Sequence, residues 1–279
     1  MSWQAIAIKD FQDAIRTRSL LVLTVLLALF IGAATFTFDQ LLGAELDSTA
    51  ALALALAGPS AFLVPILALL VSYRAIAGER SSGSIRFVLG LPHTRWEVIV
   101  GKFVGRSAVV AVAVFVGFAV GAVVAVFFAT FHPLRYLAFV LLTLVLGAVY
   151  VAVGTGLSAT TRSPTRAGVL VFFVFIVFEY LWGVVGLALL YIASGFSIDF
   201  QELPGWYEWF AAISPSASYQ YAMWELVPGV GDAGAAMETG GTEIAYGTLP
   251  FWVPILVLAA WITVPLALGR WRFDRVDIT

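Results

Sequence analysis

The 279-residue sequence contains no cysteine, only two histidines and only 11% charged residues. Without cysteine it can form no disulfide bond, no thiolate nucleophile and no cysteine-ligated metal centre. His93 and His132 have no second histidine or carboxylate at ligand spacing, so we expect no metal site.

Two kinds of enzyme are also excluded by what is missing. A phosphate-binding loop needs Gly-x-x-x-x-Gly-Lys-Ser/Thr, but Gly101-Lys102 is followed by Phe103 and has no earlier glycine at the required spacing. The long apolar segments contain no nucleophile with its base, no paired aspartates and no pair of metal-binding histidines. We therefore expect no ATP hydrolysis by this route, no intramembrane enzyme and no cofactor in the chain.

Hydrophobic residues are abundant, at 61% of the chain with 22 Phe and 9 Trp, which is more than one soluble core needs. A membrane-crossing helix takes roughly 20 mostly apolar residues. The segments of this kind are residues 20–38, 50–71, 103–131, 136–157, 167–193 and 251–268. A β-barrel would show alternating strands of about 10 residues, whereas residues 103–131 are apolar on all sides apart from Arg106 and small residues. The sequence predicts an all-α polytopic membrane protein with six transmembrane helices, forming one transmembrane domain over residues 1–279.

Positive charges divide the connections between these segments into two kinds. All of the 15 Lys and Arg residues except Arg135 lie before the first segment, around the second connection, in the fourth connection or after the last segment. Cytoplasmic connections of membrane proteins are rich in Lys and Arg. We therefore expect both termini in the cytoplasm, which agrees with an even number of spans.

Residues 1–18 are polar and the apolar segment after them is long, so we expect no cleaved signal peptide. A helical wheel places charged residues on one side and apolar residues on the other. The apolar side contains Trp3, Ala7, Ile8, Phe11, Ala14 and Ile15. This pattern predicts an interfacial helix on the inner membrane surface, with a cytosolic extension of the first span as the alternative.

The connection of residues 194–250 is the long outer one. Its aromatic run at residues 206–210 predicts a short helix or re-entrant turn near the membrane interface. Ser214-Pro215 is a start signal for a helix over residues 216–226. Five glycines follow between residues 229 and 241, which predicts a loop there.

The inner connection of residues 73–102 contains residues that typically begin and end short helices. Gly83 can end one helix and Ser84 can begin the next, while Thr94 and Glu97 have the spacing of a capping box. Apolar side chains such as Trp96 stand among the charges, which suits docking by another protein. On composition alone, a solvated basic loop would be the simpler interpretation.

A series of short motifs in this connection favours a specific family. They are, in order, Gly78-Glu79-Arg80, Gly83-Ser84-Ile85-Arg86, Leu91-Pro92, Thr94-Arg95, Glu97 and Gly101-Lys102. This series resembles the inner loop of permease subunits of type-2 ABC exporters. Residues 9–18 are similar to the membrane-surface entry helix of that family, and residues 213–219 to its outer motif before the last span.

This resemblance implies a permease that pairs with itself or with a similar permease in the plasma membrane of a bacterium or archaeon. Each half would engage a cytosolic ABC ATPase through residues 73–102, and that partner would hold the ATP and Mg. The lipid bilayer is the surrounding medium, and we expect no nucleic-acid partner. The positions that carry over as the ATPase-coupling surface are Glu79, Arg80, Gly83, Arg86, Arg95 and Glu97.

Glu179 lies near the midpoint of the fifth segment, where insertion of a comparable charge costs roughly 2.5 to 3.5 kcal/mol. Its side chain should therefore face protein or water. It is an intramembrane candidate for contact with substrate or for a change of protonation. The alternative is a neutral side chain hydrogen-bonded to a neighbouring helix.

Three functions follow as hypotheses. The first is a non-enzymatic subunit that converts ATP-driven motion of a separate ATPase into export. The second comes from a resemblance to the nitrous-oxide-reductase maturation permease and is mechanical transmission to an extracytoplasmic partner. Having no cysteine and only 3 Met argues against copper handling by this chain itself. The third is a proton-coupled secondary carrier using Glu179, which would leave the inner loop without a role.

Overall fold

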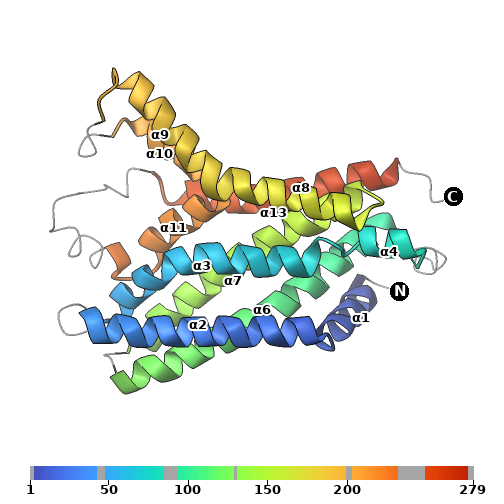
Figure 1. Cartoon of the computed structure of the whole chain (residues 1–279), viewed down its shortest axis with the longest axis horizontal. Coiled ribbons are helices and arrows are strands. Elements are labelled where there is room, and N and C mark those ends of the chain that lie inside the picture. The colour runs from blue at the N-terminus through green and yellow to red at the C-terminus, as the bar shows by residue number, and fades with distance from the viewer. Residues whose placement is uncertain are drawn as a thin grey trace.

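The computed structural model describes residues 3–42, 48–84, 94–128, 131–198, 203–231 and 249–275. Within these ranges all regular elements are helices, and six are long and apolar enough to cross a membrane. They are α2 (Arg18–Leu42), α3 (Ser48–Ser72), α6 (Arg95–Phe128), α7 (Pro133–Thr160), the run of α8 (Pro164–Ile176), η1 (Val177–Leu181) and α9 (Trp182–Ala193), and α13 (Trp252–Asp274). The predicted all-α, six-span architecture is confirmed (Figure 1).

The third span begins earlier than its apolar residues indicate. Its apolar run starts at Phe103, but α6 begins at Arg95, directly after the predicted cap residue Thr94. Hydropathy marks the part of a helix that lipid can surround, whereas the cap marks where the helix starts. The first two turns of α6 therefore carry charged residues beyond the apolar stretch.

The long helices α2, α3, α6 and α7 form a bundle, and α13 packs along α7 (Figure 1). The fifth span starts beside α7 as α8, and its second half, α9, projects away from the bundle. Two short helices, α10 (Gly205–Ala212) and α11 (Pro215–Leu226), follow it. Helix α10 packs on α9, while α11 packs against α7 and α13. The predicted helix after Ser214-Pro215 is therefore present.

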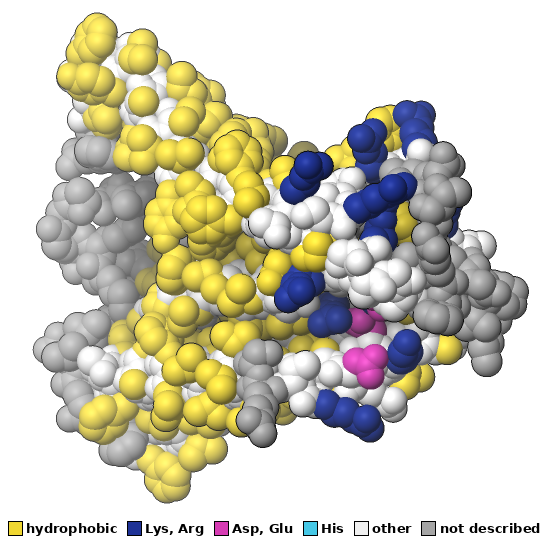
Figure 2. Space-filling model, turned by 45° about the vertical axis from the view of Figure 1, so that its right-hand side comes forward, with side chains coloured by type: hydrophobic (Ala, Val, Ile, Leu, Met, Phe, Trp, Pro, Cys, Tyr) yellow, Lys and Arg dark blue, Asp and Glu magenta, His cyan; other side chains and the backbone are white. Residues whose placement is uncertain are grey.

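The fifth span is covered least by the rest of the chain, with 11% of its apolar window buried. Phe172, Phe173, Val184 and Ile192 are among its exposed side chains. Figure 2 shows a broad hydrophobic surface, with Lys and Arg side chains gathered at one end of the molecule. An apolar surface of this extent suits lipid or a second membrane subunit rather than water.

Helix α1 (Trp3–Ile15) is separate from α2 and packs lengthwise on the first half of α6. Two glycines of α6 allow this close approach. A Cβ atom at Gly101 would lie 2.8 Å from the Trp3 carbonyl oxygen, and one at Gly105 would lie 2.8 Å from that of Ala7. The predicted helix is thus present, and small residues form the side that packs on α6.

The buried side chains of α1 are Ala7, Asp10 and Ala14, while Ile8 and Ile15 are exposed. The helical wheel placed Ala7, Ala14, Ile8 and Ile15 on one apolar side and did not distinguish the small residues that pack on α6 from the isoleucines that stay exposed. Small size, rather than hydrophobicity, selects the side that meets the glycines of α6. An aspartate beside two alanines is buried there because it has charged partners.

Helices α7 and α13 cross with their backbones in contact. A Cβ atom at Gly156 would collide with the carbonyl group of Pro265, and one at Gly269 would lie 2.7 Å from the Gly156 carbonyl oxygen. Small residues permit such close helix packing in membranes, where dispersion contacts replace the hydrophobic effect. This crossing holds the last span against the centre of the bundle.

Gly156→Ala should lower the free energy of unfolding by about 1–3 kcal/mol, because the added methyl group overpacks this crossing. Thermal unfolding of the purified chain in detergent measures the effect. Gly58→Ala is the matched control, since a Cβ atom there meets nothing within 4 Å. Equal unfolding midpoints for the two variants would contradict this account of the crossing.

Candidate functional site

Four charged side chains form a buried ion cluster where α1, α4 (Ala77–Ser82) and α6 meet. Lys102 Nζ lies 3.1 Å from Asp10 Oδ1 and 2.7 Å from Glu79 Oε1. Arg106 Nε lies 2.6 Å from Asp10 Oδ2. Lys102 and Asp10 are only 3% and 6% exposed. Removing one member would leave a buried charge without compensation, so the cluster fixes the three helices relative to one another.

Helix α4 has a defined start, bonded to α7, and a defined end at a glycine. Its first turn has no side-chain cap from its own sequence, and the Ser158 hydroxyl of α7 accepts hydrogen bonds from the N–H groups of Ile76 and Ala77, at 3.1 and 3.0 Å. At the other end Gly83 has φ 77°, the left-handed conformation that favours glycine after a helix. The predicted helix end at Gly83 is therefore confirmed.

Two arginines connect this region to the ends of α7 and α13. Arg80 donates hydrogen bonds to the carbonyl groups of Ala159 and Thr161, at 3.1 and 3.2 Å. Arg95 donates to the carbonyl group of Phe273. Both guanidinium groups also lie over the Phe273 ring, 5.5 and 5.3 Å from its centroid. Cations at the last carbonyl groups of a helix are favourable both as donors and for the helix dipole.

Glu97 forms the predicted capping box at the start of α6. Its Oε2 accepts a 2.8 Å hydrogen bond from the Thr94 N–H, and the Thr94 hydroxyl accepts one of 3.2 Å from the Glu97 N–H. Five of the six positions predicted for ATPase coupling thus shape one region through internal contacts. The sixth, Arg86, lies outside the described residues, as does the helix expected to follow Ser84.

Sequence reasoning did not identify the partners that complete this region. Asp10, Lys102 and Ser158 were not among the positions predicted for ATPase coupling, although all three are buried. Asp10 and Lys102 are 92 positions apart, and Ile76 and Ser158 are 82 apart. Local signals such as caps and charge patterns do not contain pairings over such separations. The one local signal for the burial of Asp10 was that Ala7 and Ala14 lie on the same side of α1.

The intramembrane candidate Glu179 lies in η1, a single π-helical turn that interrupts the fifth span. Its Oε1 accepts hydrogen bonds from the hydroxyl groups of Tyr150 in α7 and Ser216 in α11. These two hydroxyl oxygens lie 3.2 Å apart. Such π turns occur often at functional sites. The polar triad joins the middle of the fifth span to two neighbouring helices.

Two serines at the start of α11 lie close to backbone carbonyl groups in spans two and five, where the helices are irregular. Pro65 has no N–H, so the carbonyl group of Ala61 loses its usual helical donor. The Ser216 hydroxyl oxygen lies 3.4 Å from that carbonyl oxygen, so its single proton can be donated either to Ala61 or to Glu179. The Ser214 hydroxyl donates a 3.1 Å hydrogen bond to the carbonyl group of Phe178 within the π turn. The start of α11 therefore supplies donors where spans two and five depart from regular geometry.

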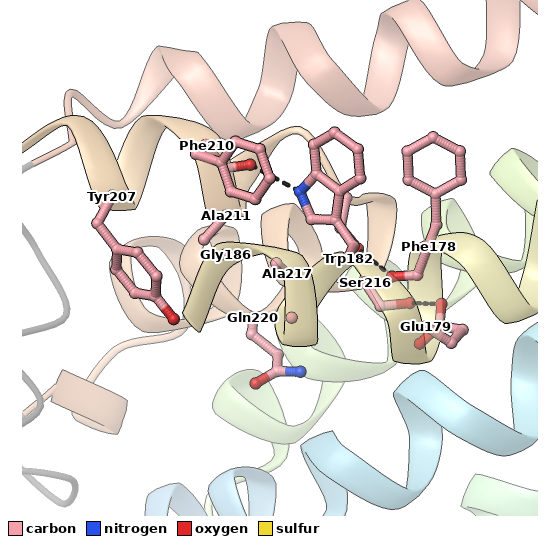
Figure 3. A pocket seen from close by; sticks show the side chains of 12 residues that line it. Phe178, Glu179, Trp182, Gly186, Tyr207, Phe210, Ala211, Ser216, Ala217 and Gln220 are labelled. Atoms are coloured by element: carbon pink, nitrogen blue, oxygen red, sulfur yellow. Dashed lines mark hydrogen bonds between the residues drawn. The ribbon is translucent and has the colours of Figure 1, made fainter. Parts of the chain in front are cut away.

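A cavity of about 160 Å³ lies next to this triad, between the fifth span and the two short helices (Figure 3). Glu179 stands at one end, and the polar groups of Gln220 and Tyr207 lie toward the other. Trp182 stacks on Phe210, with ring centroids 4.5 Å apart, and donates a 2.8 Å hydrogen bond to its carbonyl group. The cavity is large enough for several waters or a small polar ligand beside the carboxyl group.

These features define a multi-pass helical membrane protein whose short helix α4 is fastened to α1 and to three of its spans. The family model for ABC-2 family transporter proteins matches residues 4–278. The probable ABC transporter permease protein NosY of Stutzerimonas stutzeri is 30% identical over 97% of both chains. The protein of the same name from Pseudomonas aeruginosa is 30% identical over 98% of both chains.

The chain belongs to the ABC-2 transporter family and is a membrane permease subunit of an ABC transporter. Membership of that family implies a partner ATP-binding subunit. The family predicted from the inner-loop motifs is therefore confirmed.

Glu179→Gln should leave the free energy of unfolding nearly unchanged, because the amide oxygen can accept the same two hydrogen bonds. Glu179→Ala should lower it by about 1–3 kcal/mol, since both hydroxyl donors lose their acceptor. Thermal unfolding in detergent separates the two variants. Proton uptake into proteoliposomes without ATP tests the carrier hypothesis, and uptake that Glu179→Gln abolishes would show that the carboxyl group relays protons.

Proposed function

We propose that this permease couples the nucleotide cycle of a cytosolic ABC ATPase to export across the membrane. It acts as one of two permease halves, identical or similar. The α4 end of the bundle and both chain termini face the cytoplasm. The observation that carries this proposal is the buried ion cluster, because it connects the short helix α4 to both α1 and α6.

The contacts of α4 describe how a displacement would spread. Ser158 connects its start to α7, Glu79 connects its middle to Lys102 of α6, and Arg80 reaches the end of α7 and the Phe273 ring of α13. A force on α4 therefore acts on three spans at once. Small movements of one packed element are amplified in this way when neighbouring helices move as rigid bodies.

The side chains available to the ATPase are different from those that hold α4 in place. Ser81 and Ser82 are exposed on α4, and Trp96 is 37% exposed at the start of α6. By contrast, Glu79 and Arg80 are partly buried and engaged with other helices. We therefore assign contact with the ATPase to the exposed group and transmission to the engaged group.

The orientation and the docking surface can be tested together, because the chain has no native cysteine to remove. Ser82→Cys should resist a membrane-impermeant maleimide in intact cells and react in inverted vesicles. Bound ATPase should then protect it. Ser197→Cys, exposed beyond the far end of α9, should show the reverse sidedness. Labelling of Ser82→Cys from outside the cell would overturn the proposed topology.

Coupling can be measured with a fluorophore on Ser197→Cys in proteoliposomes that contain the permease and its ATPase. ATP should change the fluorescence of the parent protein. Adding Glu79→Gln should reduce that change several-fold, since the amide oxygen can still accept from Lys102 but no longer balances its buried charge. The Glu79→Gln variant should still bind the ATPase, as measured by pull-down.

Asp13→Asn is the matched control, because it removes the charge of an acid that is exposed on α1 and lies outside the ion cluster. It should respond to ATP like the parent protein. If ATP changes the fluorescence of none of these proteins although the ATPase is bound, the chain does not transmit its nucleotide cycle. A full response of Glu79→Gln would instead remove the ion cluster from the mechanism.

A second candidate function is transmission of the same movement to an extracytoplasmic partner. The helices α10 and α11 support it, because they are fastened to several spans. Trp182 and Trp261 donate hydrogen bonds to the carbonyl groups of Phe210 and Ile213, at 2.8 and 2.9 Å. Tyr219 shares a 2.9 Å hydrogen bond with Thr143 of α7. A surface built on these helices would follow any rearrangement of the bundle.

A further inference from the structure

A second, larger cavity opens between α2, α3 and α6, beside the turn that joins α1 to α2. Its volume is about 590 Å³, which lies within the range of small-molecule binding sites. Aliphatic side chains form most of its wall, including Leu23, Leu70 and Val109. Arg74 and Arg106 line it together with Thr17 and Tyr73. Figure 2 shows Lys and Arg side chains around a recess where the hydrophobic surface meets the charged end.

The two arginines of this cavity differ in their charge balance. Arg106 is paired with Asp10 and donates a 3.2 Å hydrogen bond to the Val71 carbonyl group. Within the ion cluster, the charges of Lys102 and Arg106 are matched by those of Asp10 and Glu79. Arg74 is exposed, and among the described residues its guanidinium group interacts only with the Tyr73 ring, 6.0 Å from the centroid.

Among the residues that the structure describes, no carboxylate pairs with Arg74, so it supplies an unbalanced positive charge at the edge of an aliphatic cavity. A ligand that satisfies both parts must carry an anionic group and a hydrocarbon chain. Basic pockets between transmembrane helices bind anionic lipid head groups in this way. Inorganic phosphate could use only the basic rim and would leave the aliphatic wall exposed to water.

We propose that this cavity binds one anionic phospholipid, with its phosphate at Arg74 and an acyl chain along Leu23, Leu70 and Val109. The lipid fills the space beside the turn between α1 and α2. Its head group lies next to Arg106, which holds Asp10 in the ion cluster. A bound anionic lipid thus contributes to the docking of α1 on the bundle.

The test is native mass spectrometry of the full-length chain after exchange into equal amounts of phosphatidylglycerol and phosphatidylcholine. The parent protein should retain phosphatidylglycerol preferentially. Arg74→Gln should reduce the preference about fivefold, the factor expected from one interfacial arginine. Arg166→Gln is the matched control, because Arg166 is an exposed arginine outside the cavity and should change nothing.

A second pair of variants tests the acyl chain. Val22 lines the cavity and is 55% exposed, so Val22→Trp can fill the space without disturbing the core. It should reduce lipid retention, whereas Val25→Trp, on the same helix but outside the cavity wall, should not. Equal retention of both lipids by the parent protein would overturn the proposal. An unchanged preference in Arg74→Gln together with unchanged retention in Val22→Trp would also overturn it. Displacement of the lipid by millimolar inorganic phosphate would show that the site recognises a free anion.

Discussion

The buried charge of Lys102 is the constraint on which the arrangement of α1, α4 and α6 depends. An ammonium group that is 3% exposed loses several kcal/mol of hydration. The loss is offset only because carboxylate oxygens of Asp10 and Glu79 lie within 3.1 Å. Those carboxylates come from two other helices, so both helices must be in place together. Gly101 and Gly105 make this possible by letting the backbone of α1 approach α6.

Much of the fold follows from local properties of the sequence. Lengths of the apolar segments gave all six spans, and the spacing of Thr94 and Glu97 predicted the cap that starts α6. The contacts that assemble the candidate site could not be predicted in this way. Asp10 has the same local pattern whether it faces water or a lysine 92 positions away. Which charged residue is buried is decided by tertiary packing, and a single sequence does not contain that packing.

The middle of the bundle shows how the irregular parts of several spans are accommodated together. A proline in α3 frees a carbonyl group, a π turn distorts the fifth span, and a carboxyl group lies among apolar side chains. Each would be costly alone. The hydroxyl groups of Ser214, Ser216 and Tyr150 supply donors to all three places. Sequence reasoning recognised the cost of Glu179 but not the hydroxyl groups of Tyr150 and Ser216 that offset it.

The π turn also divides the fifth span into two mechanical parts. Helix α8 stays beside α7, whereas α9 projects outward with the indole of Trp182 clamped on the ring and carbonyl group of Phe210 in α10. A displacement of α9 would therefore be passed to α10, which also packs on α11 and α13. Glu179 lies in the π turn and lines the cavity, so a displacement of α9 relative to α8 would change the shape of that cavity.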